Sequence, residues 1–190
     1  MQTNKTSLSK QLTFTAVLAA LCCVSTLLIT IPLPASGFFN TGDIFVLLSG
    51  WLLGPLFGAV AAGIGSALAD VFAGYALYAP ATFFIKGIDA LIAYLVWAIL
   101  KKLIKKDRLD FLPRLLSAVC GELFMVVGYL AFESCLYTFF GAIPNVVGNS
   151  LQGVCCLSGA VVLISLLYPI KTLQIYFPYL LPPTRKKATT

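Results

Sequence analysis

Four polar residues in one apolar stretch fall on a single face of a predicted helix. Tyr129, Glu133 and Tyr137 follow Glu122 at offsets of 7, 11 and 15 positions. At about 100° per residue these side chains stay within about 60° of Glu122. Carboxylates and phenols in apolar surroundings need hydrogen-bonding partners. The stripe therefore predicts a surface that binds a polar solute or takes part in an internal polar network.

The following apolar stretch carries a second polar stripe. Asn149, Gln152 and Cys156 follow Asn145 at offsets of 4, 7 and 11, so they stay within about 40° of it on a helix. Amides both donate and accept hydrogen bonds, which suits the recognition of a small polar aromatic solute. Asn145 follows Pro144 and has a second interpretation as the N-cap of its helix.

The composition indicates that these helices lie in a membrane. Of 190 residues, 59% are hydrophobic and 11% are charged, whereas soluble domains carry about 25% charged residues. A spanning helix takes about 20 residues, so the chain has room for about six and for no attached soluble catalytic domain. The absence of histidine argues against histidine triads and the common zinc sites. The six cysteines lie in apolar segments and are predicted to be packing residues without a metal role.

Apolar segments bounded by polar or basic residues predict the membrane spans. The predicted spans are residues 12–31, 80–100, 113–137 and 145–168. The first is longer than the apolar core of a signal peptide, which is about 7–15 residues, so we expect it to be retained. Basic residues cluster before the first span, at 101–114 and after the last. The positive-inside rule therefore places both termini and the 101–114 loop in the cytoplasm.

This orientation determines how residues 43–73 must run. They have to start and end outside, yet 31 residues are fewer than the ~40 that two full spans require. We therefore predict two short helices, 43–53 and 55–73, that form a hairpin at Gly54-Pro55. The expected fold is an all-α integral membrane protein with six transmembrane helices, both termini cytoplasmic. Residues 1–190 form a single domain, with cytoplasmic tails at about 1–10 and 171–190.

In this topology the polar groups gather in the outer half of the membrane. Glu133 and Asn149 lie about one turn below the outer ends of their helices, and Lys86 lies about 9 Å into its span. Aromatic residues of two outer loops cover them. The predicted substrate-binding residues are Asn40, Tyr75, Tyr78, Lys86, Tyr129, Glu133, Asn145, Asn149 and Gln152.

Some of these polar residues have structural alternatives. Lys86 could pair with Asp70, Asp89 or Glu133 only to neutralise its charge, and Asp43 could act only as a helix cap. Glu122 lies deeper and could be a structural or interface group.

A stripe of small residues also has two interpretations. Gly58, Ala62, Gly65 and Ala69 recur every three or four positions, a spacing that lets helix backbones approach closely. The stripe serves either packing within the protein or docking of a membrane partner.

Several motifs resemble a known family. NTGD at 40–43, LLGPLFGAVAAGIGSALAD at 52–70, GYALYAPATFFIKG at 74–87 and IPNVVGNSLQG at 143–153 are similar to the substrate-binding S components of energy-coupling-factor (ECF) vitamin transporters. The branch that looks most similar contains the S components for riboflavin, hydroxymethylpyrimidine and pyridoxine.

The resemblance implies a six-helix protein of the bacterial cell membrane that binds one vitamin or precursor in its outer half and is not an enzyme. Transport would require a transmembrane T component and two cytoplasmic ATPases. ATP would be used only by these partners, because the chain has no P-loop, and the chain itself would carry no cofactor. The family's small-residue pattern in helix 1, which contacts the T component, corresponds here to Ala16 and Ala20.

The stripes lack the many basic groups that a phosphorylated or polycarboxylate ligand would favour. We therefore expect hydroxymethylpyrimidine or pyridoxine first and riboflavin next, with no nucleic-acid partner. The alternative is a self-sufficient secondary carrier or channel, which would more often show internal repeats and broken helices in both halves.

Overall fold

The computed structural model describes residues 8–33, 37–104, 110–177 and 179–180. Its helices and strands are α1 (Leu8–Leu28), β1 (Ile31–Pro32), β2 (Phe38–Phe39), α2 (Asp43–Leu53), α3 (Pro55–Phe72), α4 (Ala79–Leu103), α5 (Phe111–Tyr137), α6 (Phe139–Leu167) and α7 (Lys171–Tyr176). Five of these helices, α1, α3, α4, α5 and α6, are long and apolar enough to cross a membrane, and α2 is a shorter apolar helix. The expectation of an all-helical integral membrane protein is confirmed.

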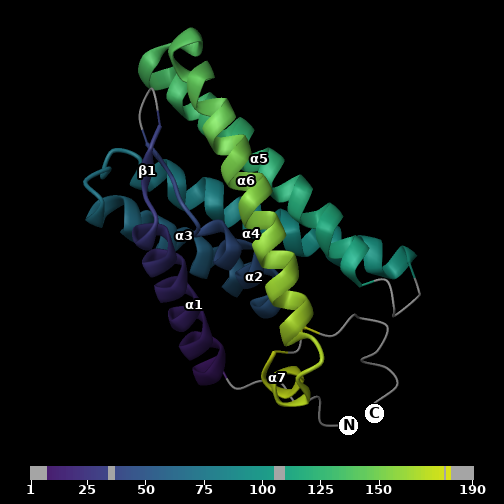
Figure 1. Cartoon of the computed structure of the whole chain (residues 1–190). Coiled ribbons are helices and arrows are strands. Elements are labelled where there is room, and N and C mark those ends of the chain that lie inside the picture. Colours follow the sequence, from purple (N-terminus) through teal and green to yellow (C-terminus); the bar gives the residue numbers. More distant parts are fainter. Residues whose placement is uncertain (1–7, 34–36, 105–109, 178, 181–190) are drawn as a thin grey trace.

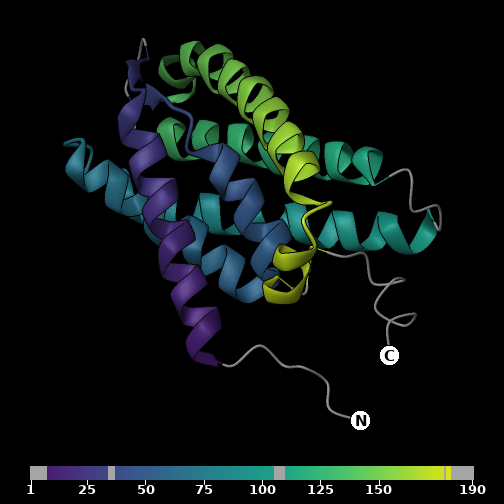
Figure 2. The same ribbon diagram turned by 60° about the horizontal axis from the view of Figure 1, so that its bottom comes forward.

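The short helix α2 lies at the centre of the bundle (Figure 1). All of its residues except Ile44 and Phe45 are buried, and it packs against α1, α3, α4 and α6. Around it α1 packs on α3, α3 on α4, α4 on α5 and α5 on α6. Figure 2 shows α4 and α5 lying side by side. The central position of α2 places its first residue, Asp43, among the polar stripes of the surrounding helices.

The predicted hairpin turn at Gly54-Pro55 is present. Gly54 has a φ of +82°, which favours glycine because it has no Cβ, and Pro55 begins α3. A Cβ on Gly54 would also lie 2.6 Å from the ring of Tyr179.

The small residues of α3 pack inside the protein. Gly58, Ala62, Gly65 and Ala69 are all buried. A Cβ on Gly58 would lie 2.5 Å from the carbonyl oxygen of Ser49 in α2. This close approach supports the packing interpretation of the stripe.

Other boundaries differ from the predictions. The last long helix, α6, starts at Phe139 instead of Asn145, and its N-cap is Thr138, whose hydroxyl accepts a hydrogen bond from the Gly141 amide at 3.3 Å. The interpretation of Asn145 as an N-cap is therefore wrong, because the helix continues through Pro144. Proline disfavours but does not forbid an interior position, since only one backbone hydrogen bond is lost.

The first span and the C-terminal region also differ. Helix α1 covers residues 8–28 and is followed by an unpredicted antiparallel ribbon in which Ile31 pairs with Phe39. Part of the predicted tail forms α7, which returns to the start of α1. The rings of Phe14 and Phe177 are 4.7 Å apart, and the ammonium of Lys10 lies 5.7 Å from the ring centre of Tyr176.

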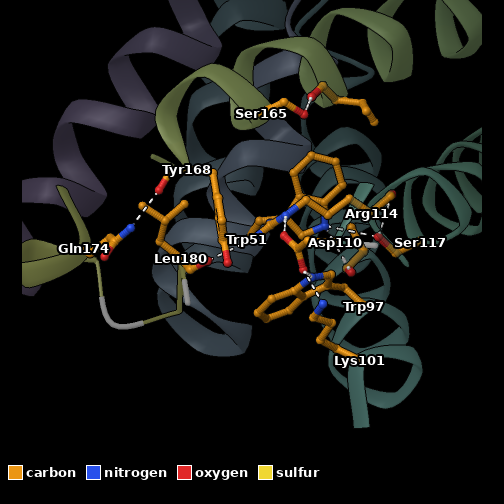
Figure 3. A network of polar contacts seen from close by, with 12 residues as sticks. Trp51, Trp97, Lys101, Asp110, Arg114, Ser117, Ser165, Tyr168, Gln174 and Leu180 are labelled. Atoms are coloured by element: carbon orange, nitrogen blue, oxygen red, sulfur yellow. Dashed lines mark hydrogen bonds and ion pairs between the residues drawn. The ribbon is translucent and has the colours of Figure 1, made fainter. Parts of the chain in front are cut away.

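A buried cationic cluster closes the same end of the bundle (Figure 3). The guanidinium of Arg114 lies 4.6 Å from the ring of Trp97 and 5.5 Å from that of Trp51. Its Nε donates to Asp110 Oδ2 at 2.7 Å, and its Nη2 donates to the carbonyl of Leu180 at 3.1 Å. These contacts link α2, α4, α5 and the C-terminal segment, and they lie at the end opposite the polar stripes.

Candidate functional site

A cavity lies between β2 and helices α3, α4, α5 and α6. It contains about 360 Å³ of empty space, including space open to solvent at its mouth. Its walls are formed by Leu33, Gly37, Phe38, Asn40, Asp70, Tyr75, Tyr78, Thr82, Tyr129, Glu133, Asn149 and Gln152.

Seven of the nine residues predicted to bind substrate line this cavity. They are Asn40, Tyr75, Tyr78, Tyr129, Glu133, Asn149 and Gln152. The other two, Lys86 and Asn145, are not part of the lining. Each contacts a lining residue: Lys86 lies over the ring of Tyr129, and Asn145 hydrogen-bonds to Glu133. The structure thus brings together residues that are more than 100 positions apart in the sequence.

Aromatic rings form one side of the cavity. The ring centres of Phe38 and Tyr75 are 5.0 Å apart, those of Tyr75 and Tyr78 are 6.1 Å apart, and those of Tyr78 and Phe132 are 5.2 Å apart. The tight turn after α3 places the tyrosines, with the Tyr75 amide donating to the carbonyl of Asp70 at 2.7 Å. Such a wall suits the face of a planar ring.

The floor of the cavity is held by a buried ion pair. Lys86 Nζ lies 2.5 Å from Asp43 Oδ1, with side-chain exposures of 3% and 1%. The other oxygen of Asp43 accepts from Gln152 Nε2 at 2.6 Å, and Gln152 Oε1 accepts from the Asn40 amide at 2.8 Å. Asn40 Oδ1 in turn accepts from the Gly42 amide at 2.9 Å. This chain of contacts ties α4, α2, α6 and β2 together.

The ion pair corrects two structural alternatives drawn from the sequence. The expected partners of Lys86 were Asp70, Asp89 or Glu133, and all three are wrong, because Asp43 provides the partner. The interpretation of Asp43 as a helix cap is also wrong, because the N-cap of α2 is Gly42 and both oxygens of Asp43 bind side chains of other helices. The sequence could not reveal this pair because the two residues are 43 positions apart.

Five lining residues were missed as site residues, and the polar ones among them are Asp70 and Thr82; the others are Leu33, Gly37 and Phe38. The Thr82 hydroxyl lies 3.0 Å from the hydroxyl of Tyr129, and the Oδ2 atom of Asp70 is buried. The sequence signal for Thr82 is spacing, because it lies four positions after Tyr78, the N-cap of α4, and four before Lys86 on the same helix face.

On the opposite wall, Glu133 is held by a hydrogen bond from the next helix. Its Oε1 accepts from Asn145 Nδ2 at 2.9 Å. Asn145 does not line the cavity itself but positions Glu133, which does. This contact joins α5 to α6.

Internal bonds occupy much of the polar lining and leave a short set of groups for a ligand. Asn40, Gln152, Thr82 and Tyr129 all hydrogen-bond within the protein. Within the described part of the chain, Asp70 Oδ2 and Glu133 Oε2 are buried without a hydrogen-bond partner. Asn149 is 6% exposed, and its amide has no partner among these residues either. The groups available to a ligand therefore include these two carboxylate oxygens and the Asn149 amide.

Two further buried carboxylates lie outside the lining. Asp89 contacts Gly121 and Glu122 contacts Gly153. None of their four carboxylate oxygens has a hydrogen-bond partner among the described residues. Among those residues no group of three or more Cys, Asp or Glu is arranged to hold a metal ion.

These features define the class of protein. A bundle of long apolar helices encloses a small cavity whose walls combine aromatic rings with hydrogen-bond acceptors, as in a membrane protein that binds a small molecule.

Comparison with known proteins names the family. A family model described as "ECF-type riboflavin transporter, S component" matches residues 7–171, so the chain belongs to the S components of energy-coupling-factor transporters. A protein of Pyrococcus woesei, described as "Uncharacterized protein in gap 3'region", is 39% identical over 132 residues, which cover 69% of this chain and 83% of that relative.

Membership has direct consequences for function and location. The chain is a multi-pass membrane protein of a transporter family and not of an enzyme family. S components bind a small molecule, a vitamin in this family, and take it up with partner subunits. Ala16 and Ala20, the predicted docking residues, are exposed on α1, away from the cavity lining.

Proposed function

We propose that the chain captures a heteroaromatic vitamin or vitamin precursor from outside the cell in the cavity between β2 and α3–α6. The observation that carries this proposal is the set of groups left free in the lining, two carboxylate oxygens and the Asn149 amide beside an aromatic wall. A planar ring stacks on the tyrosines, and its polar substituents satisfy the buried oxygens, which would otherwise be unpaired at a cost of about 1–3 kcal/mol each.

We propose that α1–α6 all cross the membrane, with both termini in the cytoplasm and the cavity in the outer half. The charges support this orientation: Lys101 and Lys102 lie at the far end of α4 from the cavity, and basic residues concentrate on the cytoplasmic side of membrane proteins. The α2–α3 hairpin then enters and leaves from outside, with Gly54 at its inner tip.

We propose that uptake requires a transmembrane T component and two cytoplasmic ATPases, and that ATP is used only by these partners. The family supports this assembly, and the exposed α1 residues Ala16 and Ala20 provide a small-residue surface on which a partner helix packs closely. The chain itself needs no cofactor in this scheme.

For the substrate we favour hydroxymethylpyrimidine or pyridoxine, with riboflavin next. Among the described residues that line the cavity none is a lysine or arginine, which disfavours phosphorylated forms. Carboxylates suit neutral or weakly basic heterocycles that carry hydrogen-bond donors. Riboflavin is the third candidate because the matched family model is named for riboflavin transport.

Mass spectrometry of the ligand that copurifies in mild detergent is the direct test. We expect one of these three compounds at close to one per chain. Reconstitution then separates this function from the self-sufficient carrier: vesicles that contain the chain alone should bind the vitamin without accumulating it. Accumulation without partner subunits, or no binding of any of the three, would refute the proposal.

A further inference from the structure

We propose that Asp70 sets the ligand specificity of the cavity, by accepting a hydrogen bond from an amino group on a small nitrogen heterocycle. The inference rests on the proposed function and narrows its substrate class. It concerns a residue that the sequence motifs did not mark as a binding residue.

The first argument is the state of the Asp70 carboxylate. The residue is 7% exposed and lies near the end of α3, on the cavity wall. Its Oδ2 is buried without a hydrogen-bond partner in the described part of the chain. A buried acceptor in this position needs a donor, and the cavity is the place from which one can come.

The second argument is that the wall beside this carboxylate is fixed. The hydroxyls of Thr82 and Tyr129 lie 3.0 Å apart, and both residues line the cavity together with Asp70. Tyr129 is positioned in turn by Lys86, whose Nζ lies 5.3 Å from its ring centre. A buried carboxylate beside a fixed wall discriminates by geometry as well as by charge.

The third argument is the polarity of the groups around Asp70. The cation nearest this wall, Lys86, is paired with Asp43 behind the lining, and Glu133 adds a second carboxylate. An aromatic amino group only donates and satisfies Asp70. A carbonyl oxygen in the same place only accepts, so it would leave two acceptors facing each other in a buried site.

The experiment compares two probes on the full chain, purified in mild detergent and washed free of ligand. The probes are hydroxymethylpyrimidine, which carries a ring amino group, and its oxo analogue, in which a carbonyl replaces that group. Calorimetry should show that the unmodified protein prefers the amino compound by about 5- to 150-fold, the range for one unsatisfied hydrogen bond.

Asp70→Asn is the decisive variant. An asparagine offers both a donor and an acceptor, so the preference should collapse to nearly equal affinities or reverse. Asp89→Asn is the matched control, because it also removes a buried carboxylate but lies outside the lining, and it should keep the preference. If Asp70→Asn does not fold, Asp70→Ala removes the carboxylate without adding a donor and should abolish the preference instead.

The outcomes separate this inference from the proposed function. Binding of the amino compound with an unchanged preference in Asp70→Asn overturns the role of Asp70 and leaves vitamin binding intact. Binding of riboflavin alone overturns the small amino heterocycle as the substrate class. Failure to bind hydroxymethylpyrimidine, pyridoxine and riboflavin overturns the proposed function itself.

Discussion

The buried pair of Lys86 and Asp43 allows a sharp test of whether Lys86 supports the structure or binds the ligand. The two charged atoms are 2.5 Å apart and almost fully buried. Removing one partner leaves the other charge buried and unpaired, which costs about 3–5 kcal/mol. Lys86→Met and Asp43→Asn should each destabilise the empty protein by that amount. For a chain of this size the loss corresponds to a fall of about 6–20 °C in Tm.

The double variant Lys86→Met/Asp43→Asn tests whether the two charges act as a pair. Replacing both charges at once removes the unpaired ion, and such replacements are often close to neutral for stability. The asparagine introduced in place of Asp43 retains an oxygen that accepts from Gln152, so the floor of the cavity should persist. We expect Lys86→Met/Asp43→Asn to recover most of the lost stability and to keep most of the ligand affinity.

The assay is thermal unfolding in detergent without ligand, followed by the fluorescence of Trp51 and Trp97, together with ligand titration of the same samples. Lys102→Met is the control, since it removes an exposed lysine from the end of the same helix and should change neither quantity. Additive losses in the double variant would contradict the coupling of the pair. A Lys86→Met protein of normal stability that no longer binds would show that Lys86 contacts the ligand.

Three further predictions concern the site, the docking surface and the topology. Asn149→Ala should weaken ligand binding about 5- to 150-fold, because one buried partner is lost, while the Tm of the empty protein changes little; unchanged affinity would remove Asn149 from the site. Ala20→Leu should leave affinity intact and weaken assembly with the T component, measured by copurification, because a bulky side chain separates the helices. A cysteine that replaces Ala76 in cysteine-free protein should react with an impermeant reagent from outside the cell, and one that replaces Lys102 only from inside. The opposite labelling would overturn the orientation.

Much of the fold follows from local properties of the sequence. Apolar length predicts the spans, since a lipid environment requires a helix of a certain length whatever its neighbours. Gly54-Pro55 predicts the hairpin, because a positive φ and a fixed proline ring act within one or two residues. Helix boundaries are harder to predict: Pro144 suggests a helix start, yet α6 begins at Phe139.

In the candidate site, too, the sequence predicts what depends on one helix and does not predict contacts between helices. Periodicity predicts which residues share a face of one helix, so Glu133, Asn149 and Gln152 could be identified as facing inward. Periodicity does not reveal what lies opposite. Three features depend on how separate helices cross. Lys86 pairs with Asp43, Gln152 hydrogen-bonds to Asn40 and Asp43, and Asp70 lines the cavity.

The sequence by itself therefore determined that the protein lies in a membrane, where most of its helices are and which helix faces point inward. Its motifs also indicated the family. Only the tertiary structure decided which polar groups are paired within the protein and which remain for a ligand. The physical reason is that a hydrogen bond or ion pair requires atoms within about 3–4 Å. The sequence spacing along one helix sets such distances only within that helix, whereas the packing of α2 at the centre of the bundle sets them between Asp43, Lys86 and Gln152.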